Sequence, residues 1–385
     1  MSSRTITLLQ PRKLVFGSGC VADAVDYVAA LPQRRVHVVS SPSLAGRVED
    51  LRERLEAAGC SASVDATIAP EPTIAAFDAA LATARAVQPD CVLGIGGGSV
   101  LDVAKLVAAL VRGSQAVEET FGIGLLQSRD CHLVCMPTTS GTGSEVSPNA
   151  ILLDENARLK KGVISPHLVP DATFIDPALT CSVPSSVTAA TGLDTLTHCI
   201  EAYTNKFAHP LIDTYALEGV SLCARYLVRA VRDGDDLEAR EGMSRASLYG
   251  GLCLGPVNTA AVHALAYPLG GEFHIAHGLS NAVLLPAVFR FNAEATPDRH
   301  ASVAIALGAN PGTSPMQTAL AGATLLEGLA RDCGIETDLS KLGIDRSAIP
   351  HMAEAALTVQ RLLRNNPRDI TKADAERMYA HCFKP

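Results

Sequence analysis

Residues 91–102 read CVLGIGGGSVLD, an apolar run followed by three consecutive glycines and the start of a helical pattern. An uninterrupted apolar run is typical of a strand buried on both faces of a parallel sheet. The glycines leave backbone N–H groups unobstructed, and a helix starting directly after them adds unsatisfied donors and a positive dipole end. No GK[ST] follows, which excludes a Walker P-loop. The stretch therefore predicts a diphosphate site, with a simple tight turn as the alternative.

Strands and helices alternate on both sides of this stretch. Runs of β-branched residues predict strands, and periodic Ala- and Leu-rich segments predict helices. The predicted strands are residues 36–40, 61–68, 91–95 and 132–136, and the predicted helices are residues 43–59, 72–87 and 101–111. This order favours an α/β class with a doubly wound parallel sheet, a nucleotide-binding domain over residues 1–180.

The pattern changes near residues 176–184, beyond which the chain shows almost no β signal. Helices are expected at residues 185–203, 211–231, 237–254, 257–267, 298–307, 315–333 and 348–363. We expect the helix around His263 to end at the breakers Pro268, Gly270 and Gly271. Residues 181–385 are therefore predicted to form an all-α domain.

Composition limits the possible functions. A chain of 385 residues, 48% hydrophobic and 19% charged, can bury a large core, which excludes a disordered protein. Its net charge of −8 argues against nucleic acid and acidic membranes as partners. No run of 18 apolar residues predicts a membrane span, and no secretory signal is evident. The 11 cysteines form no CxxC motif, so we expect reduced thiols in a cytoplasmic protein.

A second polar loop follows the strand predicted at residues 132–136. Residues 137–145 read PTTSGTGSE and offer five hydroxyl groups and two glycines. In doubly wound sheets, ligands bind outside the carboxyl ends of the strands. The loop therefore favours the rim of a dinucleotide site, although by itself it would more simply be a solvated loop.

Four residues have the chemistry of metal ligands. Asp194 and His198 lie four apart in GLDTLTHCIEAY, so on a helix they share one face with Cβ atoms roughly 5–6 Å apart. His263 and His277 lie in later segments. One carboxylate and three imidazoles suit Fe(II) or Zn(II). Each spacing alone is a weak signal, and the pattern does not decide whether the two pairs converge.

In these motifs the chain resembles the iron-containing (group III) alcohol dehydrogenase family, whose superfamily includes glycerol dehydrogenase and dehydroquinate synthase. The matching motifs occur in the family's order: GGGSVLDVAK, PTTSGTGSEVS, AATGLDTLTHCIEAY, HALAYPLGGEFHIAHGLSNAVLLP and NNPRDIT. The resemblance covers nearly the whole chain and implies a dehydroquinate synthase-like fold. It also implies an NAD(P)-dependent oxidoreductase that transfers hydride between a small alcohol or hydroxy acid and nicotinamide.

The resemblance further implies roles for individual residues. It places one Fe(II), in some members Zn(II), on Asp194, His198, His263 and His277. The positions that would contact NAD or NADP are Gly97, Gly98, Ser99, Asp102, Thr138, Thr139, Thr142, Asn149 and Lys160. Among these, Asn149 and Lys160 match a polar pair near the nicotinamide ribose. We also expect a homodimer or a higher homo-oligomer.

Two positions depart from the family pattern. The family often has a proton-relaying histidine four residues after the third ligand, where this chain has Tyr267. A tyrosine can pass a proton, but its ordinary pKa of about 10 makes it a poorer relay near neutrality, and His274 could substitute. Residues 40–43 read SSPS where many NAD-specific members carry an aspartate, so NADP should be better tolerated.

Four alternative functions are weighed against this one. A metal-free maleylacetate reductase-like enzyme would have degraded ligands, whereas all four are present. A hydroxyacid–oxoacid transhydrogenase-like enzyme is favoured by Tyr267-Pro268, with Arg368 as a candidate carboxylate partner. A dehydroquinate-synthase-like lyase would need more basic residues in its motifs. A non-catalytic NAD-sensing protein would not need the complete ligand set.

Overall fold

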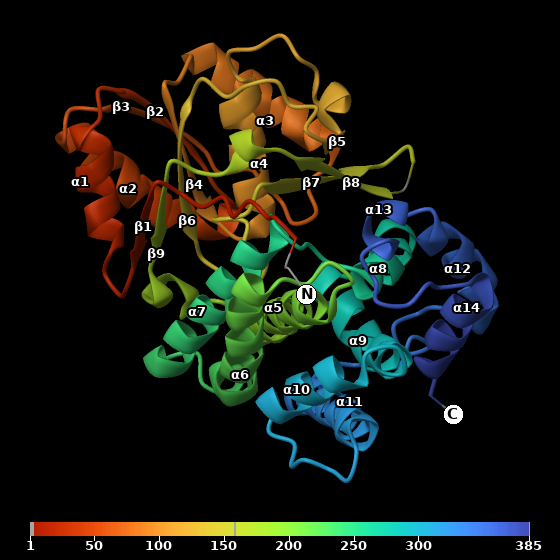
Figure 1. The fold of residues 1–385 in the computed structure, drawn as a ribbon. Coiled ribbons are helices and arrows are strands. Elements are labelled where there is room, and N and C mark those ends of the chain that lie inside the picture. The colour runs from red at the N-terminus through yellow and green to blue at the C-terminus, as the bar shows by residue number, and fades with distance from the viewer. Residues whose placement is uncertain (1–3, 158, 385) are drawn as a thin grey trace. The chain divides into compact units, whose positions relative to one another are not determined.

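The computed structural model describes residues 4–157 and 159–384, which form two compact units (Figure 1). The first unit contains Leu8–Thr139 and Gly143–Cys181. The second contains the chain from Ser182 onward together with residues 4–7 and Ser140–Thr142. The break at Cys181 falls where the sequence pattern changes, but the hydroxyl-rich loop is divided between the two units.

A parallel sheet organises the first unit. Its strand order is β1-β9-β6-β4-β2-β3, and every paired strand is parallel. The strands are β1 (Lys13–Phe16), β2 (Arg35–Val39), β3 (Ser61–Asp65), β4 (Cys91–Gly96), β6 (His132–Pro137) and β9 (Ala172–Ile175). The predicted parallel α/β architecture is confirmed.

Helices cover both faces of this sheet, which explains why β4 is apolar along its whole length. They are α1 (Val21–Ala30), α2 (Ala45–Ala57), α3 (Ile74–Val87) and α4 (Gly98–Leu110). Leu93 and Ile95 pack in the core that includes α1 and α2, whereas Val92 packs in the core of α3 and α4. Successive side chains of a strand point to opposite faces, so both faces of β4 must be hydrophobic.

The first unit also contains strands that the sequence pattern did not predict. Besides β1 and β9, a small sheet has the order β5-β8-β7, with β7 and β8 antiparallel. Its strands are β5 (Gly122–Ile123), β7 (Asn149–Asp154) and β8 (Leu159–Ile164). β8 reads LKKGVI and is only partly buried along most of its length, so it lacks the apolar run that marks β4.

Helices make up the second unit, which confirms the predicted all-α class. They are α5 (Ser185–Thr204), α6 (Pro210–Arg232), α7 (Leu237–Leu254), α8 (Ala261–Phe273), α9 (His277–Ala293), α10 (Pro297–Ala306), α11 (Pro315–Asp332), α12 (Ile349–Leu357), α13 (Gln360–Leu363) and α14 (Lys372–His381). α9 and α14 were not predicted. The expected helix at residues 348–363 is two helices. No helix in the described part of the chain is both long and apolar enough to cross a membrane.

One expected helix end is wrong. α8 continues through Pro268, Gly270 and Gly271 and ends at Phe273, where His274 adopts a left-handed conformation with φ 56°. A proline removes one intrahelical hydrogen bond, but burial of the surrounding helix offsets that loss. Tyr379 of α14 is fully buried against this helix and donates its hydroxyl to the Leu265 carbonyl over 2.6 Å. Tertiary packing therefore overrides the local breakers.

Candidate metal centre and coenzyme loop

Helix α5 aligns three buried polar side chains on one face. Asp194, His198 and Glu201 follow one another at spacings of four and three residues, the repeat that keeps side chains on one side of a helix. Each is at most 5% exposed. From Gly192 to Ala202 every residue of α5 is buried, so the part of the helix that carries this polar face leaves water little access.

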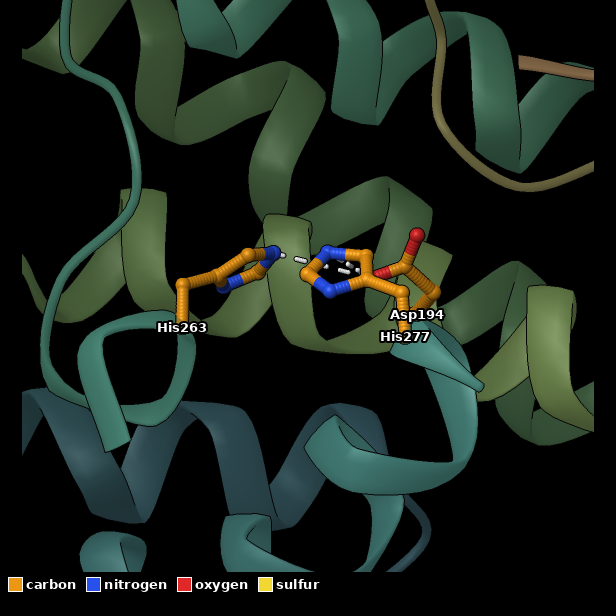
Figure 2. A group of neighbouring side chains, drawn as sticks. All are labelled: Asp194, His263 and His277. Atoms are coloured by element: carbon orange, nitrogen blue, oxygen red, sulfur yellow. Dashed lines mark ion pairs between the residues drawn. The ribbon is translucent and has the colours of Figure 1, made fainter. Parts of the chain in front are cut away.

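Two further helices bring histidines to this face. His263 lies on the first turn of α8, and His277 is the first residue of α9. Asp194 Oδ1 lies 3.7 Å from His198 Nε2, 3.5 Å from His263 Nε2 and 3.8 Å from His277 Nε2. Figure 2 shows the side chains of Asp194, His263 and His277 directed toward one another. The structure thus brings Asp194, His263 and His277 together as one group, whereas His198, the fourth predicted ligand, lies beside Asp194 but outside that group.

The spacing and chemistry of these atoms fit a divalent ion. Ligand atoms of Asp194, His263 and His277 all lie within 4.8 Å of one another. Tetrahedral ligands held about 2.1 Å from an ion are separated by about 3.4 Å, close to the distances measured from Asp194 Oδ1. A carboxylate oxygen with imidazole nitrogens is a donor set that suits Fe(II) or Zn(II). The residues present therefore fit the group that the resemblance implies.

Within this cluster, the pKa values of Asp194 and two histidines depend on their burial and on the charges of their neighbours. Burial alone would raise the pKa of Asp194, but the neighbouring His198 and His277 hold it well below its ordinary value. Burial lowers the pKa of His198. Burial would also lower the pKa of His263, but hydrogen bonds to Asp194 and Glu201 outweigh it and raise the pKa to about 9. The Asp194 carboxylate is therefore ionised near neutrality, as a metal ligand must be.

Two residues of this cluster were missed by the sequence analysis. Glu201 accepts a 2.6 Å hydrogen bond from His263 Nδ1. Asn281 is completely buried, and its Nδ2 donates to Asp194 Oδ1 over 2.7 Å and lies 3.2 Å from His263 Nε2. The available signals were spacings: Glu201 follows His198 by three residues, and Asn281 follows His277 by four, so each shares a helix face with a ligand.

The two candidate proton relays differ in surroundings. Tyr267 lies one helical turn after His263 and is 6% exposed. Its hydroxyl oxygen accepts a 3.1 Å hydrogen bond from Arg361 Nη2. A guanidinium can only donate, so this contact leaves the tyrosine's own hydrogen available to another acceptor. His274 is exposed at the left-handed end of α8.

Arg368 does not support the carboxylate-binding role that was considered for it. Its Nη1 donates to the Phe291 carbonyl over 3.1 Å and to Glu294 Oε2 over 2.6 Å. Its guanidinium also stacks on the Phe291 ring, 4.1 Å from the centroid. These contacts engage the side chain within the helical unit.

The glycine loop joins β4 to α4 in the first unit. Gly97 is the N-cap of α4, and none of the three glycines has a positive φ. Gly96 is required by packing instead, because a Cβ there would lie 2.6 Å from the Val100 Cβ. β4 lies between β2 and β6. The chain passes from β2 to its neighbour β3 on one side, and from β3 it crosses back over β2 to β4 on the other side. The loop therefore lies at the point where strand order reverses, the usual place for a dinucleotide.

Several predicted coenzyme residues are held by contacts within the first unit. Ser99 Oγ accepts the Glu71 N–H over 3.2 Å, and Glu71 forms an ion pair with Lys160. Asp102 accepts hydrogen bonds from the Ser144 hydroxyl and, over 2.9 Å, from the Ile151 N–H. These contacts tie the glycine loop and α4 to neighbouring segments of the unit.

Two threonines of the loop after β6 lie next to the glycine loop. Thr138 donates its N–H to the Gly96 carbonyl over 3.0 Å, and Thr139 Oγ1 would lie 3.3 Å from a Cβ at Gly97. Both threonines therefore lie beside the glycine loop. Thr142, predicted with them, belongs to the segment that groups with the helical unit.

Asn149 and Lys160 are not an adjacent pair. In the antiparallel ladder Asn149 opposes Ile164, whereas Lys160 opposes Leu153, four positions along β7. Asn149 Oδ1 is buried with no hydrogen-bond partner among the described residues. Such an orphaned acceptor is costly unless a donor reaches it.

Comparison with known proteins identifies matches over the whole chain. A model described as "Iron-containing alcohol dehydrogenase" matches residues 11–177, and one described as "Fe-containing alcohol dehydrogenase family, C-terminal" matches residues 188–383. Long-chain-alcohol dehydrogenase 1 of Geobacillus thermodenitrificans is 38% identical over 373 residues, covering 95% of this chain and 94% of that protein.

Solved structures agree with these matches. A 1,3-propanediol oxidoreductase has a TM-score of 0.94 at 32% identity, covering 99% of this chain and 100% of the other. Sulfoacetaldehyde reductase from Bifidobacterium kashiwanohense, solved with NAD+, has a TM-score of 0.88 at 27% identity, covering 99% of each chain.

Proposed function

The chain belongs to the iron-containing alcohol dehydrogenase family, and from that premise we propose a reaction and a site for it. As a member, it is an oxidoreductase that acts on CH–OH groups. We propose reversible hydride transfer between a small alcohol or aldehyde and NAD or NADP, with one Fe(II), or alternatively Zn(II), held by Asp194, His198, His263 and His277. The observation that carries this proposal is the convergence of a buried carboxylate and imidazoles from three helices.

Each group in the helical unit has a defined task in this reaction. Asp194 and the three histidines hold the ion, and their burial limits the access of water. When bound, the ion supplies Lewis acidity to the substrate oxygen, and the nicotinamide supplies or accepts the hydride. Asn281 keeps the Asp194 carboxylate oriented through its 2.7 Å hydrogen bond.

The proton of the alcohol needs a path to solvent. We propose Tyr267 as the first group on that path, with His274 as the alternative, because the Tyr267 hydroxyl lies one turn from a ligand and retains its hydrogen for donation. Comparing Tyr267→Phe with His274→Gln decides between them. The variant that lacks the relay should lower kcat at least tenfold with metal content unchanged.

We assign the diphosphate of the coenzyme to the glycine loop of the first unit. Backbone donors of Gly97, Gly98 and Ser99 would hold the diphosphate at the N-terminus of α4. Thr138, Thr139 and Thr142 would line it, and Asn149 Oδ1 would accept a ribose hydroxyl, which would give this orphaned oxygen a partner. The end of β2 carries serines rather than a carboxylate, so we propose that both NAD and NADP are accepted.

The state of the cysteines bears on the cellular compartment of the protein. All the described cysteines are free thiols, and all but Cys181 are buried, as expected for a protein of the reducing cytoplasm. We propose a cytoplasmic homo-oligomer, whose size light scattering would measure.

Removing one ligand tests the metal centre. His277→Ala should lower bound metal several-fold and abolish alcohol oxidation, because one of four donors is lost. NADH affinity should stay within twofold of the wild type, since the glycine loop proposed to hold the diphosphate belongs to the other unit. Metal analysis, NADH titration and turnover are measured on the same preparation. The control is His351→Ala, an exposed histidine of α12 that should change none of the three.

A specific outcome would reverse the metal assignment. If His277→Ala retains full activity after treatment with a chelator, no metal is needed. The metal-free maleylacetate reductase-like reaction would then take first place, with Tyr267 or His274 as the proton donor. A screen of aldehydes, alcohols and hydroxy acids with both coenzymes on Fe(II)-loaded protein would identify the substrate class.

A further inference from the structure

Glu201 is the one carboxylate of the buried cluster to which no ligand role has been assigned. It lies on α5, one turn after His198, and is 4% exposed. Its two oxygens receive three hydrogen bonds: from His263 Nδ1 over 2.6 Å, from the Ala260 N–H over 2.9 Å and from the Val262 N–H over 2.6 Å. A single side chain of α5 therefore binds both the start of α8 and the ligand that α8 carries.

From this geometry we propose that Glu201 is the positioning residue of the metal centre, which selects the tautomer and orientation of His263. The inference rests on the proposed function, because it takes His263 as a ligand. The Nδ1 that contacts a carboxylate must carry the hydrogen, since a carboxylate only accepts. In the neutral ring the lone pair then lies on Nε2, the nitrogen that faces Asp194 Oδ1 at 3.5 Å.

The hydrogen bonds of Glu201 also fix the orientation of the His263 ring. The carboxylate fixes the imidazole at its outer nitrogen, and the Ala260 and Val262 N–H groups fix the carboxylate. These N–H groups belong to the first turn of α8, whose donors lack partners within the helix. A hydrogen bond between buried groups is strengthened by the low local dielectric. The ring is therefore held before an ion arrives, and outer carboxylate partners of this kind typically change metal affinity by 10–100-fold.

The charge balance of the cluster also supports a role for Glu201 in the metal centre. Asp194 and Glu201 place two carboxyl groups among three imidazoles in a region that water scarcely reaches. Two carboxylates and one divalent cation sum to zero when the imidazoles are neutral, so the ion would compensate a pair of buried negative charges. Glu201 thus contributes to the charge of the site without contacting the ion.

Glu201→Gln is the direct test because it preserves the shape of the side chain while removing its negative charge and one of its two acceptor oxygens. If the amide oxygen faces Val262, the NH₂ group faces His263 Nδ1 and favours a hydrogen on Nε2, where it blocks ligation. If the oxygen faces His263, the NH₂ group opposes the Val262 N–H. We expect the Kd for Zn(II), measured by competition with a chromophoric chelator, to rise 10–100-fold. The absorption bands of Co(II)-loaded protein should also change.

Asp374→Asn is the matched control. Asp374 is another buried carboxylate at a helix start in the same unit, where it accepts the Thr371 N–H over 2.9 Å and the Thr371 hydroxyl over 2.6 Å. None of its hydrogen bonds involves a proposed ligand. The two variants therefore share the chemical change and the loss of a helix cap. Asp374→Asn should lower the thermal midpoint but leave the Kd for Zn(II) within twofold of the wild type.

Glu201→Asp provides a second test in case the Glu201→Gln variant does not fold. It keeps the negative charge but shortens the side chain by one methylene, so we expect a smaller loss of Zn(II) affinity than for Gln. An unchanged Kd in the folded Glu201 variants, or an equal rise in Asp374→Asn, would show that Glu201 only caps α8. Failure of the wild type to bind Zn(II) or Fe(II) would overturn both this inference and the metal-dependent function. Normal wild-type binding with no effect of Glu201 would overturn only the inference.

Discussion

Two buried histidines of the helical unit have pKa values shifted in opposite directions. His263 lies between two carboxylates, and their hydrogen bonds raise its pKa despite burial. His300 has no such partners. Its Nδ1 bonds the Thr296 carbonyl over 2.9 Å, its ring meets Phe289 edge-on, and burial lowers its pKa to about 4. Burial thus lowers the pKa of one imidazole, whereas neighbouring carboxylates outweigh burial and raise the pKa of the other.

His300 should make the protein sensitive to acid. Its pKa is about 4 in the folded state and about 6.5 when unfolded, so between these values the unfolded state binds more protons. Stability from the neutral ring is therefore present above pH 6.5 and lost as the pH falls toward 4, by on the order of 3 kcal/mol. His300→Gln should flatten this dependence in urea unfolding measured at pH 7, 5.5 and 4.5. The exposed His381→Gln should leave it unchanged, and an equal slope in the two variants would contradict the prediction.

The proposed acceptance of both NAD and NADP rests on a few atoms at the end of β2. Ser40 is buried and donates its hydroxyl to the Ile95 carbonyl over 2.8 Å, which ties β2 to β4 beside the glycine loop. Ser41 is only half-buried, and its hydroxyl lies 2.9 Å from that of Ser43. Of these two serines, Ser41 is therefore the one that we expect to reach the adenosine ribose of the proposed coenzyme.

Ser41→Asp should shift the preference toward NAD at least tenfold. The new carboxylate would accept hydrogen bonds from the ribose hydroxyls and repel a 2′-phosphate. Steady-state kcat/KM with both coenzymes measures the shift, and Ser41→Asn provides the uncharged control. A wild-type enzyme that already prefers NAD a thousandfold would contradict the reasoning.

At the scale of elements, α4 links the glycine loop to the rest of its unit. Lys105 of α4 is completely buried, and its ammonium group donates to the carbonyls of Ser144, Ser147 and Asn149. Asp102, one turn earlier, accepts from the Ser144 hydroxyl. These contacts hold the segment between β6 and β7 against α4, so both loops of the proposed coenzyme site depend on one helix.

Gly98→Val should abolish coenzyme binding without unfolding the protein. Gly98 begins α4 in a conformation without positive φ, so valine is not strained there, but its methyl groups would obstruct the approach of a diphosphate. We expect NADH affinity, measured by fluorescence titration, to fall at least a hundredfold while metal content is unchanged.

Gly46→Val is the control, since Gly46 lies at the start of α2 and a Cβ added there would have no neighbouring atom within 4 Å. It should retain NADH affinity. Undiminished NADH binding in Gly98→Val would show that the diphosphate binds elsewhere.

At the scale of the whole molecule, the proposed ligands divide between the two units. The metal residues belong to the helical unit and the glycine loop to the other. Hydrogen exchange followed by mass spectrometry should therefore separate their effects. Zn(II) should slow exchange at residues 258–263 and 273–281, and NADH at residues 96–102 and 138–139. Protection of the glycine loop by Zn(II) alone would contradict this division.

Much of the fold could be predicted from local patterns. The apolar run of β4 and the glycines after it predicted a buried strand, a turn and a helix because each depends on neighbouring residues. The weaker strands β7 and β8 were missed, since their stability comes from pairing with each other rather than from an apolar run. Pro268 was misread as a helix end because burial of α8 cannot be seen in the local sequence.

The candidate site, like the fold, could be predicted only in part from the sequence. The sequence by itself determined the residue types that can bind a metal and a diphosphate, because those are properties of single side chains and short loops. Only the tertiary structure decided that Asp194 meets His263 and His277, that Glu201 bonds His263 across 62 residues, and that Asn149 and Lys160 stand apart. Hydrogen bonds between distant segments depend on how helices and strands pack, and helical spacing constrains only neighbours within about a turn or two.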